Sequence, residues 1–253
     1  MEIDLSSPEF AWVKALPEEA LEGLAKEIDE YLEQSSLFDF YPETGPLRRE
    51  LYTKHMEFFK AGAKYRERCF MAANRVGKTL GAGGYECALH ATGLYPDWWE
   101  GKRFTKPIRL WVAGKFNETT RDIVQAKMFG EVTGSKPKRL TGTGLIPKDL
   151  IGEPTWKSGI QNLLDNIKIK HASGGWSLVG VKSYQQGRGS FEGTEQDVIW
   201  LDEEPPLEVY SECLVRTMTT NGLVMITFTP LGGMSDVVLS FITKELSATS
   251  REE

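Results

Sequence analysis

One short stretch of the chain combines glycine, lysine and threonine in a pattern typical of phosphate binding. Residues 72–79 read AANRVGKT and separate a short apolar run from a segment of small and apolar residues. In such a loop glycine lets the backbone approach phosphate oxygens, amide N–H groups hold the anion, lysine reaches the terminal phosphates and threonine binds Mg²⁺. Gly77, Lys78 and Thr79 fit those roles. Ala72 replaces the first glycine of the usual G-x4-G-K-[ST] pattern, so the position between strand and helix carries much of the prediction.

An arginine inside this loop adds a possible catalytic charge. Arg75 stands three residues before the lysine, where its guanidinium could reach the γ-phosphate and neutralise charge during phosphoryl transfer. The alternative is a salt bridge that shapes the loop. Arg188 and Arg139 are further candidates, which could act on a neighbouring subunit. The nucleotide-binding residues predicted within the loop are Ala73, Asn74, Arg75, Val76, Gly77, Lys78 and Thr79.

Two adjacent acids provide the groups that a nucleotide hydrolase also needs. Asp202 and Glu203 directly follow the apolar run at 198–201, which places Asp202 at the C-terminal end of a buried strand. Ligands of open α/β sheets bind at that end. We expect Asp202 to hold Mg²⁺ together with Thr79, and Glu203 to activate the attacking water, with Glu204 as the alternative base. The alternative is that these acids have no catalytic role and only begin a loop.

A third motif follows the last strongly apolar run. Thr227 and Thr229 flank Phe228 and precede a proline. Hydroxyls at a strand end that face bound nucleotide can sense the γ-phosphate and pass its loss to another element. We interpret Thr227 and Thr229 as coupling residues, and a plain Thr-Pro turn that closes the strand is the alternative.

The elements that must position these residues alternate between strands and helices. Short apolar runs predict strands at 69–73, 108–114, 198–201 and 223–228. Helices are expected at 80–91 and 118–129, and a hairpin at 167–171 and 177–183, with a long loop at 130–162 between them. This order is typical of an α/β fold with a central, mainly parallel sheet flanked by helices.

The first 50 residues differ from the rest in charge. They hold 13 acids and 4 bases, a balance of -9, whereas the other 203 residues hold 23 acids and 26 bases, or +3. Apolar spacing predicts an amphipathic helix from Pro17 to Gln34 and a second helix at 51–60. We therefore expect a helical N-terminal arm, or lid subdomain, at 1–60 and a core at 61–253.

A locally basic segment lies within that core. Residues 102–140 contain ten bases and three acids, a local +7. Such a segment is compatible with sequence-independent contacts to DNA phosphates, and a solvated face or a contact with acidic surfaces of adjacent subunits are the alternatives. The chain has no run of about 18 apolar residues, no basic and apolar leader, and no CxxC pair among its three cysteines. These absences argue against a membrane span, export, a disulfide framework and a zinc site.

With all three motifs in order, the chain resembles the ATPase domain of the large terminase subunit of tailed double-stranded DNA bacteriophages. The resemblance covers residues 51–235 and is most specific in AANRVGKT, QGRGSFEGTEQDVIWLDEEP and TFTPLGG. It implies a P-loop NTPase fold of the ASCE type, with an arginine in the loop where Arg75 stands. The other residues that match functional positions of the family are Lys78, Thr79, Asp202, Glu203, Thr227 and Thr229. His55 stands where the family has an adenine-recognition element, often with Gln, and a plain helix-surface residue is the alternative.

The resemblance also implies an activity and partners. It implies Mg²⁺-dependent ATP hydrolysis that moves double-stranded viral DNA into a procapsid, in the cytoplasm of the infected bacterium. The expected partners are the portal protein and the small terminase subunit, with a homo-oligomeric ring on the portal and a monomer in isolation. Family members continue into a nuclease domain, for which the 23 residues after Pro230 are too few, so we expect no DNA cleavage. A helicase-type ATPase and a nucleotide-gated binding or scaffold module with little hydrolysis are the alternatives.

Overall fold

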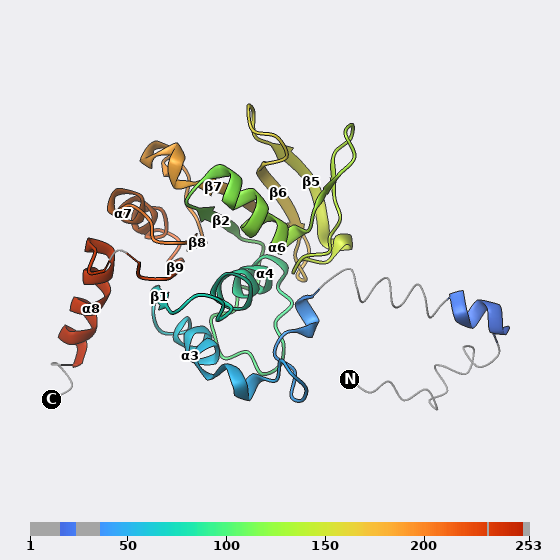
Figure 1. The fold of residues 1–253 in the computed structure, drawn as a ribbon, viewed down its shortest axis with the longest axis horizontal. Helices are drawn as coiled ribbons and strands as arrows, with labels where there is room; N and C mark the ends of the chain where they lie inside the picture. The colour runs from blue at the N-terminus through green and yellow to red at the C-terminus, as the bar shows by residue number, and fades with distance from the viewer. Residues whose placement is uncertain (1–15, 24–35, 232, 250–253) are drawn as a thin grey trace.

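The computed structural model describes residues 16–23, 36–231 and 233–249, and Figure 1 shows their fold. The predicted helix from Pro17 to Gln34 lies largely outside the described residues, although residues 18–23 are helical. Within residues 36–66, the helical elements before the sheet are η2 (Leu37–Asp39), η3 (Arg49–Tyr52) and α3 (Thr53–Ala61). The helix predicted at 51–60 is therefore confirmed. No helix in the described part of the chain is long and apolar enough to cross a membrane.

A seven-stranded sheet with the order β1-β9-β8-β2-β7-β6-β5 forms the centre of the molecule. Its strands are β1 (Glu67–Met71), β2 (Arg109–Gly114), β5 (Ile151–Trp156), β6 (Leu164–Lys170), β7 (Trp176–Ser183), β8 (Val198–Asp202) and β9 (Leu223–Phe228). The strands from β1 to β7 in this order run parallel, and β6 and β5 add an antiparallel extension. The mainly parallel sheet is confirmed. Because β9 lies between β1 and β8, the sheet has the strand arrangement of the ASCE type.

Helices cover both faces of the sheet (Figure 1). One face carries α3, the helix that runs from η4 (Lys78–Gly84) into α4 (Tyr85–Thr92), and the segment α5 (Asn117–Thr119), η5 (Thr120–Gln125) and α6 (Ala126–Phe129). The other face carries η7 (Tyr184–Gln186), η8 (Arg188–Phe191), α7 (Leu207–Arg216) and α8 (Asp236–Thr249).

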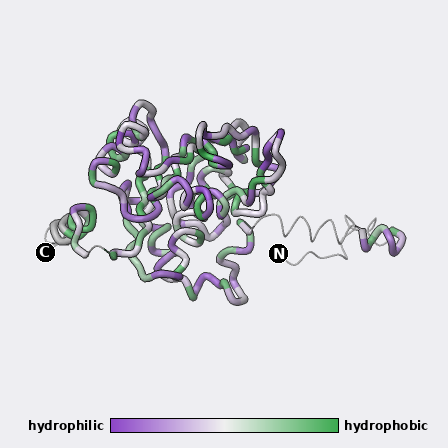
Figure 2. The backbone as a smooth tube through the Cα atoms, turned by 45° about the horizontal axis from the view of Figure 1, so that its top comes forward, coloured by the Kyte–Doolittle hydropathy of each residue, from purple (hydrophilic) through white to green (hydrophobic). Residues whose placement is uncertain are grey.

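The strand that ends in the predicted acids is buried on both sides. Val198 and Trp200 belong to the core under α4, whereas Ile199 and Leu201 belong to the core under α7. This alternation follows from the two-residue repeat of a strand, and it places Asp202 on the same face as Trp200. In Figure 2 the outlying loops around the body are largely hydrophilic. The near-continuous apolar run at 198–201 is explained by its place in a central strand of a parallel sheet that helices cover on both faces.

The prediction of a loop throughout residues 130–162 is wrong. This segment contains the short ribbon β3 (Val132–Thr133) and β4 (Arg139–Leu140), the turn η6 (Lys148–Leu150) and the whole edge strand β5. Gly152 and Pro154 lie within β5 and make its sequence look like a loop. Proline is tolerated there because β5 pairs only with β6, so its outer side does not need ladder hydrogen bonds.

A buried polar network fixes the strand and the helix that flank the AANRVGKT loop. Arg68 on β1 donates two hydrogen bonds to Glu86 on α4, at 3.0 and 2.6 Å. His90 Nε2 lies 3.1 Å from the same carboxylate, and all three side chains are buried. Burial alone would raise the pKa of Glu86, but the charge of Arg68 and the hydrogen bond from His90 hold it below its usual value. The carboxylate therefore stays ionised and ties the two elements together.

Candidate functional site

The AANRVGKT loop connects β1 to η4, as predicted. Gly77 is the residue before the helix and has φ +84°, and Arg75 has φ +64°. Glycine adopts this left-handed conformation freely, whereas a residue with a Cβ adopts it only when its surroundings impose it. Lys78 is buried, and its Nζ donates to the carbonyl oxygen of Ala73 at 2.6 Å. The ammonium group thus curls back over the loop, where a phosphate oxygen can replace the carbonyl.

Asp202 lies beside this loop, at the C-terminal end of β8. Thr79 Oγ1 donates to the carboxylate of Asp202 at 3.0 and 3.2 Å, and Thr227 Oγ1 donates to it at 2.8 Å. Burial raises the pKa of Asp202 to about 6, and the hydrogen bonds from Thr227 and Thr79 oppose that rise. The structure therefore brings together the hydroxyl and the carboxylate that the sequence predicted as one metal site.

Trp200 supports this carboxylate, and the sequence analysis missed it. Its indole N–H, which can only donate, lies 2.8 Å from Thr227 Oγ1. The single proton of the Thr227 hydroxyl is therefore left for Asp202. A Cβ on Gly83 would lie 2.2 Å from the indole nitrogen, so the glycine of the helix leaves room for the ring. The position of Trp200 two residues before Asp202 was the available signal, because strand residues two apart share a face.

Glu203 stands at the exposed end of the same strand. Its φ is +68°, and its N–H donates to the carbonyl oxygen of Thr227 at 2.9 Å. The side chain is open to solvent next to Asp202, and Glu204 follows it half-buried. The hydroxyl of Tyr184 lies 3.0 and 2.9 Å from the carbonyl oxygens of Asp202 and Glu203. Sequence spacing gave no sign of Tyr184, because it reaches this turn from η7, which follows another strand of the sheet.

The predicted coupling residues contact different partners. Thr227 is buried behind Asp202, and the two residues are paired in the register of β8 and β9. Thr229 Oγ1 donates instead to Asn74 Oδ1 at 2.7 Å and so joins the end of β9 directly to the AANRVGKT loop. The two hydroxyls therefore bind different groups near the loop, Thr227 the carboxylate of Asp202 and Thr229 the amide of Asn74.

His55 lies against the loop, although on α3. It is buried, so the plain surface position considered from the sequence is wrong. His55 Nε2 is 3.0 Å from the carbonyl oxygen of Val76, and Nδ1 is 2.6 Å from the hydroxyl of Tyr41. Burial lowers the pKa of His55, so the neutral ring donates from Nε2 to Val76 and accepts at Nδ1. A cavity of about 220 Å³ opens here, lined by Phe40, Tyr41, Leu47, Tyr52, His55, Arg75, Val76, Gly77, Leu80 and Gly81.

The three candidate arginines differ in their surroundings. Arg75 is exposed, lines this cavity and forms no salt bridge within the described residues, so the loop-shaping ion pair is not seen. Arg188 pairs with Glu212 at 2.9 Å within the same chain, and its side chain is 56% exposed. Arg139 is exposed on β4 of the small ribbon. None of these positions tests which arginine acts in catalysis.

The basic segment at 102–140 has bases at both ends of β2. The strand β2 divides it, because four of its bases precede or begin that strand and six follow it. The start of β2 lies beside the start of β8, at the end of the sheet opposite to Asp202. The later bases, from Lys115 to Arg139, belong to the segment that leaves the carboxyl end of β2, the end at which Asp202 lies.

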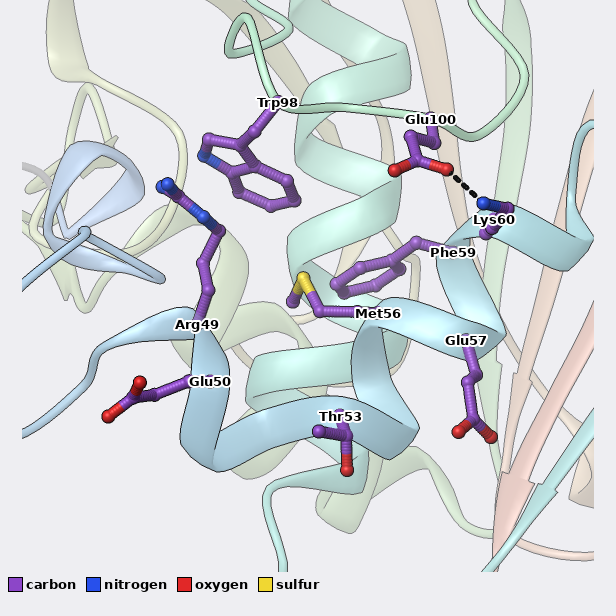
Figure 3. A pocket seen from close by; sticks show the side chains of 9 residues that line it. All are labelled: Arg49, Glu50, Thr53, Met56, Glu57, Phe59, Lys60, Trp98 and Glu100. Atoms are coloured by element: carbon purple, nitrogen blue, oxygen red, sulfur yellow. Dashed lines mark ion pairs between the residues drawn. The ribbon is translucent and has the colours of Figure 1, made fainter.

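A second cavity lies on another side of α3 (Figure 3) and is separate from the AANRVGKT loop. It has a volume of about 420 Å³, and none of the loop residues lines it. Its charged groups include Lys60 and Glu100, which form an ion pair at 2.5 Å. The residues around it are Arg49, Glu50, Thr53, Met56, Glu57, Phe59, Lys60, Trp98 and Glu100.

The chain is similar to known proteins in both sequence and fold. The terminase large subunit of Salmonella phage P22 is 38% identical over 239 residues, which are 87% of this chain and 45% of that protein. The chain thus spans less than half the length of this curated relative. The crystal structure of the HK97 bacteriophage large terminase has a TM-score of 0.51 at 14% identity, over 83% of this chain and 39% of that one. The profile of the family "Terminase large subunit, T4likevirus-type, N-terminal" matches residues 69–251, so the chain belongs to this family.

Proposed function

We propose that the chain binds ATP and Mg²⁺ at the AANRVGKT loop and hydrolyses the β–γ bond by in-line attack of water. The observation that carries this proposal is the direct contact between Thr79 and Asp202, with Glu203 next along the chain. It joins the loop, the metal carboxylate and the base in one place. The family to which the chain belongs supports the same chemistry.

The residues present fit a magnesium site. Mg²⁺ takes oxygen ligands and is usually held by one or two carboxylates together with substrate phosphates and waters. Thr79 and Asp202 supply such oxygens, and no cluster of three His, Cys, Asp or Glu occurs among the described residues to favour a protein-only cage. When bound, the metal would neutralise charge that develops on the phosphate oxygens during hydrolysis.

The protein groups divide the remaining work. Lys78 and the loop amides stabilise the phosphate oxygens, and Lys78 exchanges the Ala73 carbonyl for them. Glu203 orients the attacking water and takes up its proton, since its side chain is exposed at the strand end. Arg75 acts as an internal arginine finger. The cavity between His55 and the loop takes the nucleoside base against the ring of His55.

We further propose that hydrolysis moves double-stranded DNA into a procapsid. The family to which the chain belongs favours such a packaging motor over the helicase-type alternative. The motor assembles as a ring on the portal with the small terminase subunit, in the host cytoplasm. Lys136, Lys138 and Arg139, on and beside the β3–β4 ribbon, contact DNA phosphates. Charge reversal at these three positions is expected to reduce salt-dependent DNA binding, measured by fluorescence anisotropy. Unchanged binding would remove this surface from the DNA path.

Nucleotide binding tests the site itself. Lys78→Ala removes the ammonium that the loop holds and is expected to weaken ATP binding by at least about tenfold in calorimetry. Lys64→Ala, an exposed lysine before β1, serves as a control for the loss of one positive charge. Equal affinity of Lys78→Ala and the parent would contradict the assignment of the loop.

A further inference from the structure

Tyr184 holds the turn that carries the two catalytic acids. Its hydroxyl donates toward the carbonyl oxygens of Asp202 and Glu203, at 3.0 and 2.9 Å. A phenol has one proton, so the two consecutive carbonyls share it in a three-centre hydrogen bond. Tyr184 is 7% exposed, which leaves little room for water to replace this donor. The contact is therefore a defined part of the folded turn.

The backbone of Glu203 needs such support. Its φ of +68° lies in the left-handed region, which a residue with a Cβ occupies only when the surrounding structure imposes it. On the β9 side, its N–H donates to the carbonyl oxygen of Thr227 at 2.9 Å. The exposed Glu203 side chain makes no hydrogen bond or ion pair within the described residues. The direction of its carboxylate thus depends on the backbone, which Thr227 and Tyr184 hold from two sides.

Tyr184 is itself fixed by its neighbours. It begins the turn η7 directly after β7, and β2 lies between β7 and β8 in the sheet. The next residue, Gln185, donates its N–H to the carbonyl oxygen of Lys115 at 3.2 Å. Gln186 accepts a hydrogen bond from Lys157 at 2.9 Å. These contacts anchor η7 to the residues that follow β2 and β5, so the hydroxyl is already in place before substrate binds.

We propose that Tyr184 is a positioning residue for ATP hydrolysis. Its hydroxyl keeps Glu203 in the left-handed turn, so that the carboxylate points toward the attacking water. Tyr184 acts through the backbone of Glu203, and the inference rests on the proposed roles of Asp202 and Glu203. Without the hydroxyl, the turn loses the donor to both carbonyls and Glu203 can relax to a commoner backbone conformation.

The variant Tyr184→Phe removes only the hydroxyl. We expect its kcat to fall at least about fivefold, because a small misplacement of a catalytic group is enough for such a loss. The KM for ATP and the affinity for ATP in calorimetry should stay within about twofold, since the hydroxyl of Tyr184 donates to the Asp202–Glu203 turn and not to the AANRVGKT loop. Tyr210→Phe is the matched control, because this buried tyrosine donates to Glu67 at 2.7 Å on β1. Parent-like kcat in Tyr184→Phe would overturn the proposal.

The same change in the Glu203→Gln background separates positioning from general structural damage. If Tyr184 acts through Glu203, Tyr184→Phe should not reduce the residual turnover of Glu203→Gln any further. An equal additional loss in both backgrounds would instead show that the hydroxyl acts elsewhere in the protein.

Hydrogen exchange supplies a readout that does not depend on turnover. The amides of residues 203 and 204 should exchange faster in Tyr184→Phe than in the parent and in Tyr210→Phe, because the turn has lost one of its two supports. Unchanged exchange would contradict the proposal. If the parent itself shows no Mg²⁺-dependent hydrolysis, the proposed function fails, and the exchange rates alone then decide whether Tyr184 holds the turn.

Discussion

Replacing the carboxylate of Asp202 by an amide tests the electrostatics of the site quantitatively. In the metal-free protein, burial raises the pKa of Asp202 from 3.8 to about 6, against the hydrogen bonds from Thr227 and Thr79. Ionisation of this group therefore lowers the stability of the folded protein relative to the unfolded chain. Asp202→Asn removes the charge, and its oxygen can still accept both hydroxyls, because both donate to Oδ1 in the parent.

The sign and size of the effect follow from the raised pKa. Well below pH 3.8 the carboxyl group is protonated in both states, and its titration does not affect stability. As the pH rises from about 4 to about 6, the unfolded chain loses this proton while the folded state retains it, so the parent loses stability until the pH passes about 6. The shift from 3.8 to about 6 corresponds to roughly 3 kcal/mol in full. The free energy of unfolding of Asp202→Asn, relative to the parent, should thus rise by about 2 kcal/mol between pH 4.5 and pH 8.

Urea unfolding in EDTA, without nucleotide, at pH 4.5, 6 and 8 would measure this difference. Glu203→Gln is the matched control, because it removes the same charge from an exposed side chain and should show no comparable rise. Asp202→Asn should at the same time lose the Mg²⁺ dependence of nucleotide binding. A stability difference that is independent of pH, or that shrinks as the pH rises, would refute the reasoning.

Three further predictions concern the supports of the site. Arg68→Met leaves the fully buried Glu86 without its arginine partner and should lower the free energy of unfolding by about 3–5 kcal/mol in urea titrations. A loss below about 1 kcal/mol would contradict this. Gly83→Ala places a Cβ 2.2 Å from the indole nitrogen of Trp200 and should lower the melting temperature by several degrees, and an unchanged value would show that the ring can move aside. Trp200→Phe removes the indole N–H that the Thr227 hydroxyl accepts. It should weaken Mg²⁺-dependent nucleotide binding by up to about tenfold in calorimetry and leave metal-free binding unchanged. The same Mg²⁺ dependence as in the parent would count against the support by Trp200.

Much of the site could be predicted because its parts are local in sequence. A strand, a glycine-containing loop and a helix follow one another at 67–92, so their order alone places Lys78 and Thr79 at a helix start. Asp202 follows an apolar run, and the end of a parallel strand is where the sheet meets its ligands. The contact between Thr79 and Asp202 then follows from a sheet that brings both strand ends to one side.

The remainder depends on contacts that no local pattern encodes. Tyr184 reaches Glu203 across β2, and their separation of 19 positions in the sequence follows no pattern that predicts this contact. His55 carries a polar side chain on a short helix, and only packing against Tyr41 shows that it is buried on the loop. The strand β5 was missed since Pro154 disfavours strands except at an edge, and an edge position is a property of the whole sheet.

In the proposed mechanism, the AANRVGKT loop and Asp202 bind Mg²⁺ and ATP, while Glu203 activates the attacking water. Release of γ-phosphate in a single turnover, with the protein in excess over ATP, tests it most directly by comparing the parent with Glu203→Gln. The parent should release γ-phosphate in a Mg²⁺-dependent reaction. Glu203→Gln should still bind ATP but release γ-phosphate at least about a hundredfold more slowly. Release by Glu203→Gln at the rate of the parent would contradict it.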